Sequence, residues 1–118
     1  MARTRIYYKW DIPGSVVIIV NAVLADYARR EKIIRDANAS EAVLKKAVEL
    51  NAIVDKALED IEPGIRREII RDISLGRGYN KSNCCVLMQN ETYYRRRRKL
   101  VHDIAVSLSL INSDNSHQ

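Results

Sequence analysis

The feature that most constrains the fold is a regular apolar seam in residues 41–61. Its members recur in alternating steps of four and three, which places them on one side of a helix and does not fit a strand. They are Val43, Ala47, Leu50, Val54, Ala57 and Ile61. Leu44, Ile53 and Leu58 widen this stripe on one side, which suits a helical bundle better than a bare two-stranded coiled coil. The seam therefore predicts an all-α protein.

Proline and glycine residues divide the rest of the chain, because both interrupt a helical pattern. Such breaks occur at Pro13-Gly14, Pro63-Gly64 and Gly76-Arg77-Gly78. The first precedes a helix expected over residues 16–35, which should pack antiparallel against the helix of residues 41–61. Three more helices are predicted after Pro63, over residues 65–75, 81–88 and 91–109.

These helices suggest two parts and a tail within the 118 residues. Residues 1–62 comprise a basic and aromatic arm followed by an antiparallel helical hairpin, which would serve packing or dimerisation. Residues 63–111 have the layout of a three-helix unit with a helix-turn-helix. Residues 112–118 are polar and are expected to be disordered.

The excess of positive over negative charge lies in the second part. Residues 1–62 contain ten Lys/Arg and ten Asp/Glu, whereas residues 63–111 contain ten Lys/Arg and four Asp/Glu. Such asymmetry is typical of contact with nucleic acid or, less often, with an anionic membrane surface. The densest run, residues 95–99, lies inside the helix of residues 91–109. A solvated cationic face without a ligand is the alternative, but the helix-turn-helix layout favours a DNA interface.

Helical geometry divides this basic run, because five successive residues wind more than a full turn around the helix axis. The apolar stripe of the same helix comprises Tyr94, Val101, Ile104, Ala105 and Leu108. On the outward face, we expect DNA bases to be read by Thr92, Arg95, Arg96 and Lys99. Phosphate contacts are expected from Arg98, Lys81 and Arg77. Structural roles within the helix are expected for Tyr93, Tyr94 and Arg97, the last pairing with an acid such as Asp72.

The sequence offers no constellation for catalysis or for metal binding. Cys84 and Cys85 are adjacent and therefore very poorly placed to bond to each other, and with His102 they lack the spacing of zinc ligands. The apolar stretch of residues 15–24 is about half of the roughly 20 residues that a membrane span needs. We therefore expect a cytoplasmic protein that is not an enzyme, with no cofactor, no metal, no small-molecule substrate and no membrane contact.

Residues 65–111 resemble the small phage-encoded transcriptional regulators of the RinA and ArpU type, whose C-terminal part is similar to region four of bacterial sigma factors. The resemblance is carried by Gly78-Tyr79, Thr92-Tyr93-Tyr94-Arg95 and the helix end from Ile104-Ala105 to Leu108. It implies a phage or prophage regulator in the host bacterial cytoplasm that binds double-stranded promoter DNA and activates late genes. Thr92 to Arg95 match the start of the family's recognition helix, and RNA polymerase becomes a candidate partner.

Two other functions fit parts of the chain. One is a DNA-packaging component of the small-terminase kind, in which a helix-turn-helix recognises the packaging site while other helices form a ring. The other is an assembly protein that grips a partner helix through the seam of residues 41–61. A homodimer through residues 16–61 is a further candidate for the transcriptional regulator.

Overall fold

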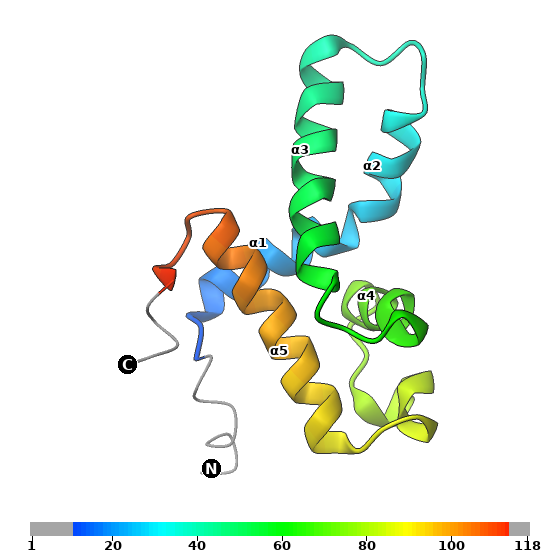
Figure 1. The fold of residues 1–118 in the computed structure, drawn as a ribbon, viewed down its shortest axis with the longest axis vertical. Coiled ribbons are helices and arrows are strands. Elements are labelled where there is room, and N and C mark those ends of the chain that lie inside the picture. The colour runs from blue at the N-terminus through cyan, green and yellow to red at the C-terminus, as the bar shows by residue number, and fades with distance from the viewer. Residues whose placement is uncertain (1–10, 114–118) are drawn as a thin grey trace.

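The computed structural model describes residues 11–113, which form helices and contain no strand (Figure 1). The α-helices are α1 (Gly14–Ala25), α2 (Tyr27–Ile34), α3 (Glu41–Leu58), α4 (Arg66–Ser74) and α5 (Asn90–Ser107). Three short 3-10 turns lie between them: η2 (Pro63–Ile65), η3 (Tyr79–Lys81) and η4 (Asn83–Val86). The predicted all-α class is confirmed. The basic arm and nearly all of the polar tail lie outside the described residues.

The sequence pattern predicted one continuous helix over residues 16–35. The structure instead divides this segment at Asp26 into α1 and α2. Figure 1 shows α2 beside α3 and α1 running in a different direction. At the bend, the buried guanidinium of Arg30 donates to the carbonyl oxygen of Val23 at 2.6 Å. A side chain inserted at the helix backbone is a common cause of such kinks. The bend lets α1 pack on α4 and α5 while α2 packs on α3.

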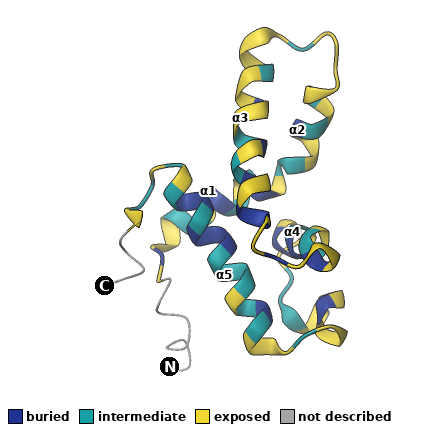
Figure 2. Cartoon of the chain, viewed as in Figure 1, coloured by how far each residue is buried: buried dark blue, intermediate teal, exposed yellow. Residues whose placement is uncertain are grey.

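A polar pair lies inside the α2–α3 contact. Arg30 is 4% exposed, and its Nε donates to Oδ1 of Asn51 at 2.6 Å. The Asn51 amide in turn donates to the carbonyl of Tyr27 at 3.3 Å. Because these buried groups satisfy one another only in this register, they fix how α2 and α3 align. Beyond them, the far end of the hairpin is largely exposed (Figure 2).

The hydrophobic core joins α1, the C-terminal half of α3, α4 and α5. Its most completely buried aliphatic side chains come from all four helices: Val20, Leu24, Val54, Ile69, Leu100 and Ile104. The expected division at residue 62 therefore does not coincide with a gap in the core, since α1 packs with the helices that follow it. No helix in residues 11–113 combines the length and apolarity needed to span a bilayer.

The prediction of a helix over residues 81–88 is wrong. That segment contains the end of η3 and the whole of η4, separated by Ser82 in an extended conformation with φ −92° and ψ 148°. The Ser82 hydroxyl accepts from the backbone N–H of Cys84 at 3.0 Å, which starts η4. Cys84 is buried, whereas Cys85 and Leu87 are exposed. Two tight turns thus connect α4 to α5.

Candidate nucleic-acid interface

Tyr93 anchors the N-terminal half of α5 to α4. Its side chain is fully buried, and its hydroxyl donates to Oδ2 of Asp72 at 2.8 Å. Asp72 is also fully buried and receives a second, ionic partner in Arg77, with Nη2 2.8 Å from Oδ1. Burial and the hydrogen bond to the Asp72 carboxylate raise the pKa of Tyr93 to about 12. The expectation that Tyr93 is a core aromatic agrees with this position.

Arg97 points inward, as the helical geometry predicted, but its partners differ from the expected ones. Its Nη1 donates to the Tyr93 hydroxyl at 2.9 Å and to the carbonyl oxygen of Arg77. The acid expected for it, Asp72, is bound instead by Arg77 and Tyr93. Arg77 also pairs with Glu68 at 3.0 Å and is only 25% exposed. The structure therefore places Arg77, a predicted phosphate contact, in an internal ion-pair network.

Tyr94 joins α5 to the turn region. Its hydroxyl oxygen accepts the backbone N–H of Tyr79 at 2.9 Å. Gly78 lies so close that an added Cβ would be 2.7 Å from that oxygen. The Tyr79 hydroxyl donates to the carbonyl of Met88 at 2.6 Å, which closes the turns against the start of α5. These contacts fix the direction in which the first turns of α5 project.

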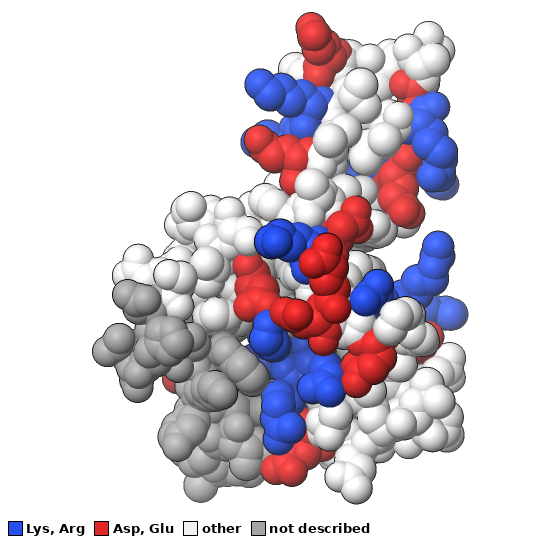
Figure 3. All heavy atoms as spheres, in the orientation of Figure 1, with Lys and Arg blue, Asp and Glu red and all other residues white. Residues whose placement is uncertain are grey.

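The four residues expected to read DNA bases lie in different surroundings. Thr92 is half-buried, and Arg95 is exposed and makes no ion pair within residues 11–113. Arg96 pairs with Glu62, its Nη2 lying 3.1 Å from Oε2. Lys99 pairs with two acids, Asp60 at 2.8 Å and Asp103 at 2.7 Å. Figure 3 accordingly shows basic and acidic side chains intermingled across the middle of this face.

The ion pairs shift the titration of the groups involved. The hydrogen bond from Lys99 lowers the pKa of Asp60, and the one from Arg96 lowers the pKa of Glu62. For Lys99, burial acts to lower the pKa, but the hydrogen bonds to its two acids outweigh burial, and the pKa is raised. All of these groups are therefore charged near neutral pH.

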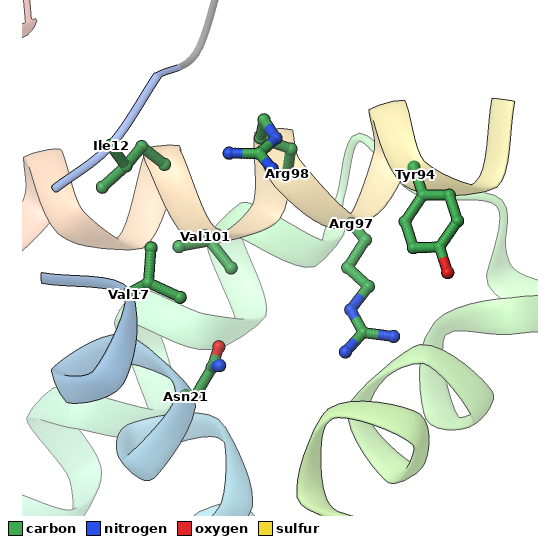
Figure 4. Close-up of a pocket in the computed structure, with 7 residues that line it drawn as sticks. All are labelled: Ile12, Val17, Asn21, Tyr94, Arg97, Arg98 and Val101. Atoms are coloured by element: carbon green, nitrogen blue, oxygen red, sulfur yellow. The ribbon is translucent and has the colours of Figure 1, made fainter. Parts of the chain in front are cut away.

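The two other predicted phosphate contacts, Arg98 and Lys81, differ in solvent exposure. Arg98 is half-buried and lines a cavity of about 180 Å³ between α1 and α5, together with Ile12 and Val17. Figure 4 shows Arg98 lying along α5, while Arg97 extends away from that helix. Lys81 is exposed at the end of η3. Of the two, Lys81 is the one on the open surface.

His102 lies on the buried side of α5 and is only 7% exposed. Its Nδ1 lies 3.1 Å from Oδ1 of Asp103. Within residues 11–113, no three His, Cys, Asp or Glu side chains gather in a way that could hold a metal ion. The chemistry of this surface is thus that of arginine, lysine and carboxylate groups.

No family model, no curated protein and no solved structure matches this chain. The resemblance to phage regulators therefore remains a prediction.

Proposed function

We propose that the protein is a sequence-specific, DNA-binding transcriptional regulator that inserts α5 into the major groove. The observation that carries this proposal is Arg95, an exposed arginine in the second turn of an anchored helix. Arginine presents two parallel N–H donors that match O6 and N7 of guanine. A helix with side chains is about 10–12 Å across, which matches the major groove.

The anchoring of α5 supports the same proposal. A base-reading side chain is useful only when its helix is held in one orientation. Here Tyr93 is hydrogen-bonded to a buried carboxylate, and Tyr94 is hydrogen-bonded to the turn before the helix. Arg95 follows both tyrosines directly and faces solvent. Thr92, Arg96 and Lys99 would complete the reading surface, with Lys81 and Arg98 contacting phosphate.

Two finer parts of the proposal concern what the protein regulates and how it assembles. Activation of phage late genes and contact with RNA polymerase rest only on the sequence resemblance. A homodimer through residues 16–61 is supported by apolar side chains exposed on α3, Val43 at 50% and Val48 at 48%. Burial of these exposed apolar side chains against a second copy of the chain would be energetically favourable.

The test begins with duplexes selected from a random pool by the purified protein. Arg95→Ala should weaken binding to the selected site by about 1–3 kcal/mol and relax preference at one base position, while Lys81→Ala should weaken all sequences alike. Arg35→Ala is the matched control, because Arg35 is an exposed arginine at the end of α2. This substitution also removes one positive charge, but from a residue that is far from α5 in the sequence.

Two results would count against the proposal. If the wild-type protein shows no salt-dependent affinity for any duplex, it does not bind DNA. If Arg95→Ala and Arg35→Ala behave alike on selected and random duplexes, Arg95 does not read a base. A stable ring of many subunits in light scattering would instead favour the DNA-packaging function.

A further inference from the structure

The linker between α3 and α4 carries two carboxylates that reach α5. Asp60 and Glu62 flank Ile61, which is 3% exposed and fixes the linker in the core. The Ile61 carbonyl also accepts a hydrogen bond from Nε of Arg66 at 2.7 Å. The positions of the two acids are therefore determined by a buried neighbour rather than by a freely moving loop.

Both acids hold cations that are expected to contact DNA. Nε and Nη2 of Arg96 donate to the two carboxylate oxygens of Glu62, each at 3.1 Å, in a forked arrangement. Nζ of Lys99 donates to Oδ2 of Asp60 at 2.8 Å. Arginine makes the same two-point contact with a carboxylate, a phosphate or a guanine edge. The linker acids thus occupy positions that oxygen atoms of DNA would otherwise take.

We propose that Asp60 and Glu62 compete with DNA for Lys99 and Arg96 and so weaken binding to every duplex. This inference rests on the proposed DNA-binding function. On a random duplex the two cations gain only phosphate contacts, and both ion pairs must break. At a selected site, hydrogen bonds to base edges add to the gain. Because the same two ion pairs must break on either duplex, the acids weaken specific and non-specific binding alike, and the base contacts of a selected site compensate for the loss.

The strength of the ion pairs suits this role. The Arg96 and Glu62 side chains are 32% and 51% exposed, and those of Lys99 and Asp60 are 38% and 61% exposed. Ion pairs at such exposure shift an equilibrium by at most about fivefold each. DNA can therefore displace the acids. Once displaced, they remain close to the phosphates and repel them, which adds to the penalty.

The experiment compares two double variants with the same change in charge. Asp60→Asn/Glu62→Gln removes both linker acids and leaves Asp103 as the remaining acid beside Lys99. Glu41→Gln/Glu59→Gln is the control, because these exposed glutamates make no side-chain ion pair in residues 11–113. Titration with the selected duplex and with a random duplex is carried out over a range of salt concentrations. Thermal unfolding followed by circular dichroism verifies that each variant is folded.

We expect Asp60→Asn/Glu62→Gln to bind the random duplex between about twofold and 25-fold more tightly than the control does, from two pairs of this strength. The selected duplex should gain by a similar factor, because the same two pairs break there. The slope of log K against log salt should become more negative by about 1–2, close to 0.9 for each phosphate neutralised by a cation that no longer has a linker acid beside it. If the double variant is unstable, each single variant should show part of the same change.

The outcomes separate this inference from the function on which it rests. Suppose that the wild-type protein prefers the selected site and that Arg95→Ala removes the preference. Equal affinities for the two double variants, or weaker binding by folded Asp60→Asn/Glu62→Gln, then overturn the competition and leave the proposed function intact. A wild-type protein without salt-dependent DNA binding overturns both.

Discussion

Removing the Tyr93 hydroxyl tests whether the contact with Asp72 holds α5 in place. In Tyr93→Phe, Oδ2 of Asp72 loses its donor at 2.8 Å, while Oδ1 keeps Arg77. Asp72 is 0% exposed, so water does not readily replace the lost donor. A hydrogen bond to a charged group contributes about 1.5–3 kcal/mol, and the buried oxygen left without a donor places the cost in the upper part of that range. We expect a loss of about 2–3 kcal/mol.

Urea unfolding followed by circular dichroism measures this loss. With a slope of about 1–3 kcal/mol per molar urea for a small domain, the midpoint should fall by about 1 M at an unchanged slope. Tyr27→Phe is the matched control, because the Tyr27 hydroxyl donates to the exposed Asp55, where water can substitute. It should cost less than about 1 kcal/mol. Equal midpoints for the two variants would refute the reasoning about Asp72.

Three further outcomes follow from the same surroundings. Gly78→Ala should destabilise the fold by about 1–3 kcal/mol, because the new Cβ would lie 2.7 Å from the Tyr94 hydroxyl, and Tyr94→Phe should remove much of that cost in a double-mutant cycle. A thiol reagent should modify the exposed Cys85 quickly and Cys84 only on unfolding, since Cys84 is buried and burial raises its thiol pKa. The raised pKa of Tyr93 implies that stability is lost between about pH 10, where an unfolded tyrosine ionises, and about pH 12, and Tyr93→Phe should flatten this decline in unfolding experiments.

The seam of α3 was predictable because a repeated apolar spacing needs only a helix and a partner. How deeply each residue of the seam is buried depends on how much of α3 the partner helix covers. Val54 is fully buried and Ala47 is 3% exposed, whereas Val43 is 50% exposed. The reason is length: α2 has 8 residues and α3 has 18. The sequence pattern alone does not reveal how much of a stripe the neighbouring helix can reach.

The bend at Asp26 shows another limit of sequence patterns. The apolar residues of α1 suit a long hairpin helix as well as a short core helix, because α1 is apolar around most of its circumference. What decides between them is tertiary: α1 packs on α4 and α5, and Arg30 reaches back to the Val23 carbonyl. The sequence places Arg30 shortly after the apolar stretch, but its burial is visible only in the structure.

The candidate site was predictable in the part that depends on α5 alone. The inward direction of Arg97 and the outward direction of Arg95 follow from the angle between successive helical residues. The partners of Arg96 and Lys99 were not predicted, because Glu62 and Asp60 come from a linker more than thirty residues earlier. Their positions depend on the docking of α3 against α5, which a single-helix argument does not contain.

This distribution of charge changes what the composition implies for DNA binding. The six excess positive charges of residues 63–111 suggest broad attraction to any polyanion. Yet Arg77, Arg96 and Lys99 are each held by acids, and Asp60 and Glu62 come from outside that segment. Four other cations, Arg67, Arg71, Lys81 and Arg95, are exposed and make no ion pair within residues 11–113. If the protein binds DNA as proposed, these four can contact it without losing an acid partner, whereas Arg77, Arg96 and Lys99 cannot.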